Sequence, residues 1–175
     1  MKIVLETDRL LLRPWRVSEA AILHELWTER DPRVPAHRRI GTDGHPTVED
    51  IEDRIRDDFH ASALGLLAAE LKGCGDIIGY CGLTENDKVP EAEPELAFEF
   101  LRRTWGQGYA TEASRAVLSW AQASGYLQLW ATVSDWNAAS RRVLAKLGFT
   151  ETDRVEPSEG HGDVLFTTKQ LGAER

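Results

Sequence analysis

The spacing of apolar residues changes along the chain from a helical to a strand-like period, and each change predicts an element. Apolar positions three or four apart predict a helix over 17–30, capped at its start by Ser18, and a second helix over 48–61. Thr47 and Asp50 have the spacing of a capping box for this second helix. Its apolar stripe, which we expect to face the core, consists of Val48, Ile51, Ile55 and Phe59.

Shorter apolar runs with a two-residue period predict strands. The first, 8–15, is stopped by a proline. The runs 64–72 and 76–85 are joined by the glycine-rich GCG and predict an antiparallel hairpin. The last two runs, 149–156 and 163–169, flank PSEGHG and predict a closing hairpin.

Between these hairpins, strands and helices alternate. Strand 95–101 precedes helix 111–124, and strand 127–133 precedes helix 137–147. Strands joined by a crossover helix lie parallel. The pattern therefore predicts an α/β (α+β) fold with a mixed, mostly antiparallel sheet, one parallel strand pair and about four helices. No break in composition divides the chain, so we expect a single domain over 1–175.

Composition and charge narrow the class of protein. No stretch approaches the roughly 20 apolar residues that span a bilayer, and we expect a cytoplasmic protein without a membrane partner. A net charge of -8 disfavours a nucleic-acid surface and suits cationic partners such as amines. Cys74 and Cys81 form no CxxC motif, and the five histidines have no metal-ligand spacing, so we expect no metal site.

The segment RTWGQGYATEA, residues 103–113, carries two glycines between a strand and a helix. A helix that begins after such a turn offers unpaired amide N–H groups and the positive end of its dipole to a phosphate or pyrophosphate. Gly106 and Gly108 would let the backbone approach the anion closely.

Other interpretations of the turn differ in how well they fit. A phosphate-binding Walker loop needs Lys and then Ser or Thr after its last glycine, where this chain has Tyr109 and Ala110. A dinucleotide-binding turn would gain support from Asp135 but lacks the third glycine, because that position is Thr111. A tight turn without any ligand stays open.

The residues around the turn resemble a known family. Arg103-Thr-Trp-Gly106-Gln-Gly108 is similar to the R/Q-x-x-G-x-G/A signature of GCN5-related N-acetyltransferases, or GNAT enzymes. GYATEA, DWNAASRRVLAKLGF at 135–149 and the opening LETDRLLLRPW resemble the RimJ/RimL-like branch of that family. The resemblance implies a GNAT fold, in which the two parallel strands splay apart.

The resemblance also implies acetyl-CoA as co-substrate, with its pyrophosphate on the amides of the turn and its pantetheine arm along the end of strand 95–101. A backbone N–H of that strand would polarise the thioester carbonyl. Asn137 matches the family's cofactor-contacting asparagine, although it would equally serve as a plain helix N-cap. The cofactor-binding residues implied are Phe100, Leu101, Arg103, Trp105, Gly106, Gln107, Gly108, Tyr109, Ala110, Thr111, Asn137 and Ser140.

Direct transfer to an amine requires a base, because a primary amine with a pKa near 10 is mostly protonated at neutral pH. The two-residue period puts Glu95 and Glu99 on one face of strand 95–101, and either is a candidate, directly or through a water. A partly solvated sheet face would explain both acids without catalysis. Several relatives place a catalytic Glu where this chain has Thr132.

The proton for the departing thiolate has a weaker candidate. Many members of the wider family have a tyrosine seven residues after the asparagine, where this chain has Leu144. Ser140 matches a serine of the RimJ/RimL-like branch, and its hydroxyl could bond the sulfur. A thiol pKa near 8.5 also lets the thiolate leave with little protonation.

The resemblance implies an amine acceptor, preferably a protein N-terminal α-amine, with a small-molecule amine as the alternative. A catalytically idle CoA-binding module and a homodimer are also compatible with the sequence. The acceptor-site walls are expected in the loops 30–46 and 86–94, which have the least regular pattern.

Overall fold

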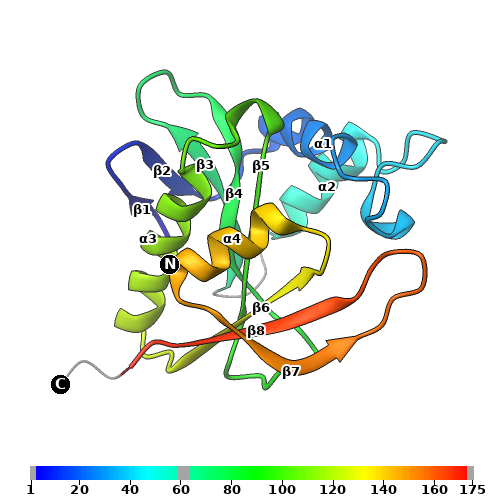
Figure 1. Ribbon diagram of the computed structural model, residues 1–175. Coiled ribbons are helices and arrows are strands. Elements are labelled where there is room, and N and C mark those ends of the chain that lie inside the picture. The colour runs from blue at the N-terminus through cyan, green and yellow to red at the C-terminus, as the bar shows by residue number, and fades with distance from the viewer. Residues whose placement is uncertain (1–2, 59–63, 173–175) are drawn as a thin grey trace.

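The computed structural model describes residues 3–58 and 64–172, which form an eight-stranded sheet with helices on both faces (Figure 1). The strands are β1 Leu5–Glu6, β2 Leu10–Arg13, β3 Gly65–Leu71, β4 Ile77–Thr84, β5 Glu95–Phe100, β6 Gln128–Ser134, β7 Thr150–Glu156 and β8 Val164–Gln170. The helices are α1 Ala20–Thr28, α2 Val48–Asp58, α3 Tyr109–Ala123 and α4 Ala138–Leu147, with short 3-10 turns η1 Val17–Glu19, η2 Ala36–Arg38 and η3 Arg102–Thr104.

The sheet has the order β1-β2-β3-β4-β5-β6-β8-β7. Every neighbouring pair is antiparallel except β5 and β6, which run parallel. The predicted mixed sheet, its one parallel pair and the four helices are therefore confirmed. Both predicted hairpins are present as β3–β4 and β7–β8.

Of the two predicted helix caps, one is confirmed and one was wrong. The capping box before α2 is confirmed, because the Thr47 amide donates to Asp50 and the Asp50 amide donates to the Thr47 hydroxyl. The Ser18 cap was wrong. The first helical segment begins with η1, and its N-cap residue is Arg16, whose amide donates to the Glu19 carboxylate at 2.8 Å. Phe59 lies outside the described residues.

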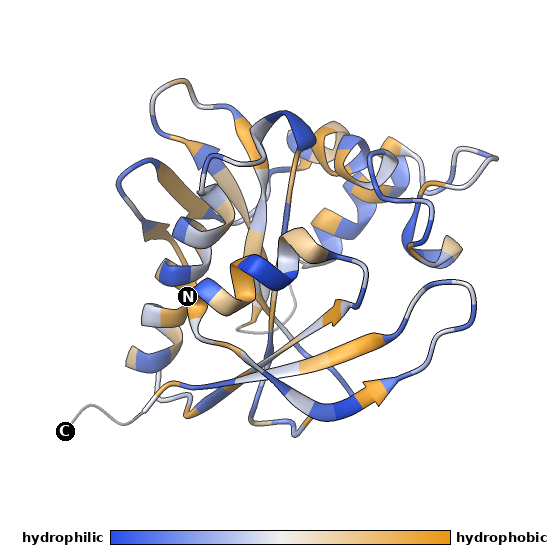
Figure 2. Cartoon of the chain, in the orientation of Figure 1, coloured by the Kyte–Doolittle hydropathy of each residue, from blue (hydrophilic) through white to orange (hydrophobic). Residues whose placement is uncertain are grey.

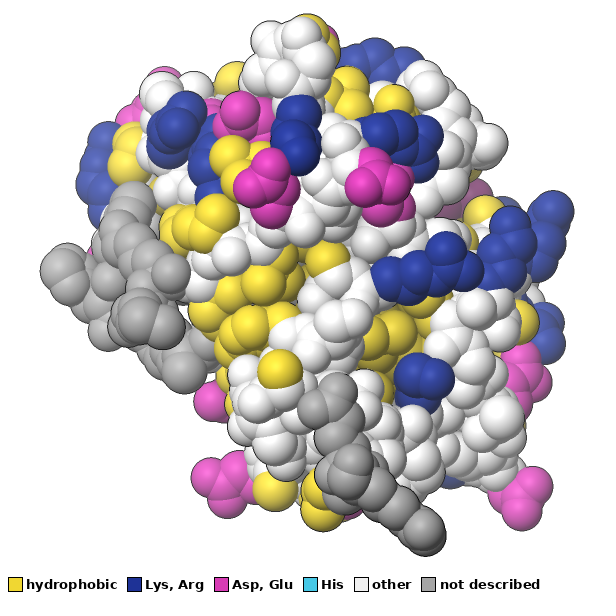
Figure 3. Space-filling model, turned by 90° about the vertical axis from the view of Figure 1, so that its left-hand side faces the viewer, with side chains coloured by type: hydrophobic (Ala, Val, Ile, Leu, Met, Phe, Trp, Pro, Cys, Tyr) yellow, Lys and Arg dark blue, Asp and Glu magenta, His cyan; other side chains and the backbone are white. Residues whose placement is uncertain are grey.

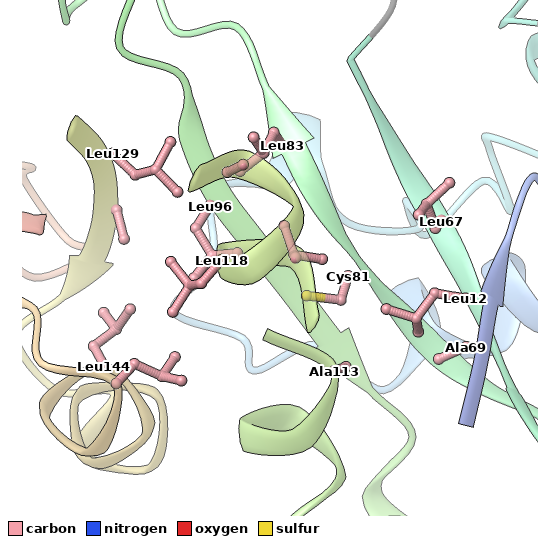
Figure 4. Close-up of a cluster of buried hydrophobic side chains, with 14 of the residues drawn as sticks. Leu12, Leu67, Ala69, Cys81, Leu83, Leu96, Ala113, Leu118, Leu129 and Leu144 are labelled. Atoms are coloured by element: carbon pink, nitrogen blue, oxygen red, sulfur yellow. The ribbon is translucent and has the colours of Figure 1, made fainter. Parts of the chain in front are cut away.

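Two clusters of buried side chains hold the helices against the sheet. One joins α1 and α2 to the sheet through residues such as Leu26, Ile51 and Tyr80. The other lies under α3 and α4, where Leu118 and Leu144 pack on the strands (Figure 4). Hydropathy alternates along α3 and α4, as expected of helices with one face on a core (Figure 2). Helices therefore cover both faces of the central part of the sheet, whereas the edge strand β7 is largely exposed.

The parallel pair separates almost as soon as it forms. Pairing between β5 and β6 is confined to one residue pair, Glu95 with Trp130. Beyond it, β5 keeps its other partner, β4, up to Phe100, and β6 pairs with β8 up to Ser134. We call the diverging part of β5 and β6 the splay. In the splay, two neighbouring strands leave facing backbone groups unpaired over several residues.

Candidate active site

The turn between η3 and α3 leaves a row of amide groups free. Gly106 and Gly108 have φ angles of 75° and 83°, which other residues adopt only with strain. Gly108 is the N-cap of α3, which explains why this helix begins at Tyr109, two residues before the predicted start. Within the part of the chain that the structure describes, the amides of residues 106–111 find no acceptor. Such a row of donors at a helix N-terminus is suited to binding an anion.

The side chains at the entrance of the turn already have partners. Arg103 pairs with Glu25 of α1 at 2.5 Å. Trp105 is 58% exposed, and its indole N–H donates to the Phe100 carbonyl at 2.6 Å. Gln107 is exposed, whereas Tyr109, Ala110 and Thr111 are half-buried in the first turn of α3. The turn thus presents backbone rather than charge.

The edge of β5 at the splay presents two backbone amides. Leu101 donates its amide to Ile78 of β4 at 2.9 Å. Because backbone groups alternate along a strand, the amides of Phe98 and Phe100 point the other way, towards β6. The Leu101 carbonyl accepts two bonds from Thr104, and its side chain is fully buried. Phe98 and Phe100, rather than Leu101, therefore offer donors to a ligand in the splay.

Glu95 lies where the splay begins. Its carboxylate accepts the Thr132 amide at 2.8 Å, the Thr132 hydroxyl, and the Asn86 amide group at 2.7 Å. The Thr132 amide would bond a β5 carbonyl if the parallel ladder continued. Within the described residues no cation pairs with Glu95, so its charge is held by neutral donors alone.

Glu99 lies on the α1 and α2 side of the sheet and is paired with a cation. Arg30 binds it with two bonds, Nε to Oε1 at 2.8 Å and Nη2 to Oε2 at 2.5 Å, and the Tyr80 hydroxyl donates to Oε2 at 2.7 Å. Burial, together with the Glu99 charge, raises the pKa of Tyr80, so this phenol stays protonated. The predicted loop 30–46 thus reaches the candidate base through its first residue.

Asn137 and Ser140 stand together at the start of α4. The Asn137 side-chain oxygen accepts the Ser140 amide at 3.1 Å, so Asn137 is the helix N-cap. Its amide nitrogen and the Ser140 hydroxyl make no hydrogen bond to any residue that the structure describes. Leu144, where relatives have a tyrosine, is buried in the core. These two free polar groups come from the side of the sheet that carries α4.

Two sets of contacts around the site could not be predicted from any local pattern in the sequence. Arg9 and Thr7, in the connection between β1 and β2, bind Glu112 in the first turn of α3. On the other side, the Arg33 guanidinium lies 4.1 Å from the centre of the Trp136 ring, just before α4. Both join residues about a hundred positions apart, and only the folded sheet brings them together.

Other features of the surface do not form this site. A hollow of about 500 Å³ lies between residues 36–46 and α2, away from the turn. Among residues 3–58 and 64–172, no cluster of three or more His, Cys, Asp or Glu side chains could hold a metal ion. None of the described helices is long and apolar enough to cross a membrane.

A glycine turn with free amides beside a splayed parallel strand pair is the arrangement that the resemblance to acetyl-CoA-dependent transferases implies. Comparison with known proteins gives the family: residues 9–150 match the model of the acetyltransferase (GNAT) domain. The chain therefore belongs to the GNAT family of acetyltransferases. Enzymes of this family use acetyl-CoA as co-substrate and act on an amine acceptor.

Individual relatives agree with this assignment. YkkB, an uncharacterised protein of Bacillus subtilis, is 32% identical over 148 residues, which are 84% of this chain and 85% of YkkB. A GNAT-family acetyltransferase from Bacillus anthracis has the same fold, with a TM-score of 0.77 over 97% of this chain and 99% of that one, at 20% identity.

Two further solved structures share the fold but have different acceptors in their names. One is the ribosomal-protein-S5-alanine acetyltransferase from Vibrio fischeri, with a TM-score of 0.71, 17% identity and 97% of both chains covered. The other is a mutant form of the spermidine/spermine N-acetyltransferase from Vibrio cholerae, with a TM-score of 0.74, 16% identity, and coverage of 94% of this chain and 95% of that one. The fold therefore leaves the acceptor open.

Proposed function

We propose that this protein transfers the acetyl group of acetyl-CoA to a protein N-terminal α-amine by direct attack of the amine on the thioester. The observation that carries the proposal is the row of free amides at 106–111 beside the splay. The choice of acceptor rests on the resemblance to the RimJ/RimL-like branch. A small-molecule amine is the alternative acceptor.

In this proposal the turn holds the donor by its backbone. The pyrophosphate binds the amides between Trp105 and Thr111, where the α3 dipole adds favourable charge. The pantetheine arm follows β5, and the amide of Phe98 or Phe100 polarises the thioester carbonyl. A donor fixed in this way stabilises the oxyanion of the tetrahedral intermediate. The amide group of Asn137 completes the cofactor contacts.

We propose Glu95 as the base, with Glu99 as the second candidate. Glu95 holds its charge without a cationic partner, and its carboxylate lies against Thr132, the position where several relatives carry a catalytic Glu. Both carboxylate oxygens of Glu99 are already bound by the Arg30 guanidinium, and Oε2 also accepts the Tyr80 hydroxyl. Glu95 would take the proton from the ammonium before attack or from the adduct after it.

Ser140 is proposed to hydrogen-bond the departing sulfur through its free hydroxyl. The C–S bond breaks as the tetrahedral adduct collapses, and the sulfur leaves as CoA thiolate or takes a proton. Because a thiol has a pKa near 8.5, a single hydrogen bond suffices to stabilise it near neutral pH. The whole proposed reaction takes place within one domain, and a cytoplasmic location and a homodimer remain predictions.

The test is CoA release with a panel of amines. We expect release with peptides that carry a free N-terminal alanine or serine, and none with the same peptides blocked at the N-terminus but containing lysine. Release with spermidine alone would replace the preferred acceptor by a small-molecule amine. Tight CoA binding without release from any amine would leave an idle CoA-binding module.

The turn itself is tested by a matched pair of glycine variants. Gly106 and Gly125, at the two ends of α3, have positive φ angles, and no other atom lies within 4 Å of the Cβ that alanine would add. Each alanine should cost about 1 kcal/mol of unfolding free energy. Only Gly106→Ala should weaken CoA binding measured by calorimetry. Equal CoA affinity in the two variants would contradict the role of the turn.

A further inference from the structure

The connection between β1 and β2 is bound to the first turn of α3 through Glu112. The Arg9 side chain donates from Nε to Glu112 Oε2 at 2.6 Å, and the Arg9 amide donates to Oε1 at 2.9 Å. The Thr7 hydroxyl donates to the same Oε1 at 2.6 Å. Arg9 and Glu112 therefore form a charge-assisted, two-point contact between segments that are 103 residues apart.

Arg9 also reaches the glycine turn. Its Nη1 donates to the Gln107 carbonyl at 3.0 Å, and its guanidinium lies 4.3 Å from the centre of the Tyr109 ring. A turn whose amides face an anion must direct carbonyls away from it, because peptide N–H and C=O groups point in opposite directions. Arg9 holds one of these outward carbonyls and so fixes the orientation of the peptide that follows it, whose N–H belongs to Gly108.

Glu112 poses an electrostatic problem for a phosphate site. A glutamate in the first helical turn normally interacts well with the helix dipole, but here it lies beside the amides proposed to bind a pyrophosphate. Burial tends to raise the pKa of Glu112, but hydrogen bonds from Thr7 and Arg9 outweigh it and lower the pKa. Glu112 is therefore charged at neutral pH and would repel the pyrophosphate unless a cation compensates it.

The surroundings give Glu112 one such cation. Arg9 is the basic residue that pairs with Glu112 in the part of the chain that the structure describes. On the face of the molecule with β1 and α3, acidic and basic side chains intermingle along the upper part, above a hydrophobic area (Figure 3). Charge compensation at this end of α3 thus comes from a segment outside both the turn and the helix.

We propose that Arg9 is a positioning residue for the pyrophosphate of acetyl-CoA. Arg9 neutralises Glu112 and orients the turn through the Gln107 carbonyl. The inference rests on the proposed function, because it takes the 106–111 amides as the pyrophosphate site. It assigns the β1–β2 connection to the binding of the acetyl donor, although this connection lies far in the sequence from the glycine turn. Its distinctive consequence is that Arg9 matters only for ligands that carry the pyrophosphate.

The experiment compares CoA with pantetheine, which lacks the pyrophosphate and the nucleotide. Arg9→Ala should weaken CoA binding about tenfold and leave pantetheine binding unchanged, both measured by calorimetry. Arg9→Lys keeps the charge but loses the two-point contact with Glu112 and the bond to Gln107, so its CoA affinity should lie between those of the wild type and Arg9→Ala. The control is Arg115→Ala, which removes an exposed arginine of the same helix that has no ion pair with a described residue.

A double variant separates compensation of Glu112 from direct contact with phosphate. Arg9→Ala/Glu112→Gln removes both charges and should regain part of the CoA affinity lost in Arg9→Ala, because the repulsion is removed but the hydrogen bond to the Gln107 carbonyl is not restored. A double variant as weak as Arg9→Ala would overturn the inference, and so would equal losses for CoA and pantetheine. Wild-type protein that binds no CoA would overturn the proposed function, whereas normal CoA binding by Arg9→Ala overturns only this inference.

Discussion

At the scale of single residues, two carboxylates on one strand face have acquired different environments. Glu95 is held by neutral hydrogen-bond donors, and Glu99 is bound by the Arg30 guanidinium and Tyr80. Within the described residues, the oxygens of Glu99 are therefore engaged by a cation, whereas those of Glu95 are not. The two-residue period could not distinguish Glu95 from Glu99 as the base. Their different environments allow mutagenesis to decide between them.

Glu95→Gln should lower kcat about 100-fold, because it removes the proposed base but keeps the shape of the side chain. Glu99→Gln should lower kcat less than about tenfold. Adding Thr132→Glu to the Glu95→Gln variant should restore part of kcat, since it returns a carboxylate to the same place from the neighbouring strand. The measurement is the pH dependence of steady-state rates with saturating acetyl-CoA. A larger loss in Glu99→Gln would make Glu99 the base.

The sequence could predict candidate residues for the site but not the partners that bind their polar groups in the fold. Gly106 and Gly108 were singled out because they stand together between a strand and a helix, where glycine lets the backbone approach an anion, and this is a local pattern. Asn137 was recognised as a possible N-cap from its place just before a helix, which is also local. Arg30 lies 69 residues from Glu99, and Thr7 lies 105 residues from Glu112, and no local period carries that information.

At the scale of elements, a buried ion-pair network ties the first helical segment to the sheet. Arg13 of β2 is 7% exposed and pairs with Glu19 of η1 at 2.5 Å and with Glu70 of β3 at 2.7 Å. The Glu19 carboxylate also accepts the Arg16 amide, which is why it sets the start of this segment in place of Ser18. The sequence predicted the helix from its period, whereas its first turn depends on this tertiary network.

Glu19→Gln should reduce the unfolding free energy by about 3 kcal/mol at pH 7, because it leaves the Arg13 charge short of a partner in a buried site. Burial tends to raise the folded-state pKa of Glu19. Hydrogen bonds from Arg13 and Arg16 outweigh this effect and lower the pKa below its usual 4.5. The stabilisation is therefore complete above about pH 4.5 and is lost as the pH falls through the folded-state pKa.

Urea unfolding of the wild type and Glu19→Gln between pH 3 and pH 7 measures this loss, and the two curves should converge at low pH. Glu159→Gln, which changes an exposed glutamate in the connection between β7 and β8, should leave stability unchanged. A difference between wild type and Glu19→Gln that stays constant across the range would rule out the ion pair as its source.

At the scale of the whole molecule, three distant segments meet beside the ends of the splayed strands. Trp136 follows β6, His161 lies in the connection between β7 and β8, and Arg33 belongs to the loop after α1 (Figure 1). The Trp136 indole donates to the His161 carbonyl at 2.7 Å, and the His161 ring nitrogen lies 2.9 Å from the Arg33 carbonyl. The order of strands and helices was predictable, but this meeting depends on the three-dimensional path of three irregular connections.

We expect the loop 30–46 to border the entrance of the proposed acceptor, because these contacts hold it beside the ends of the splayed strands. Arg33 stacks on Trp136 and pairs with Asp31 at 2.9 Å, so it links the start of the loop to the segment before α4. Arg33→Ala should release the loop and raise the KM for the acceptor several-fold, while the KM for acetyl-CoA stays unchanged. Arg16→Ala, an exposed arginine outside these contacts, is the control. A rise in the KM for acetyl-CoA alone would instead place this part of the loop on the donor side.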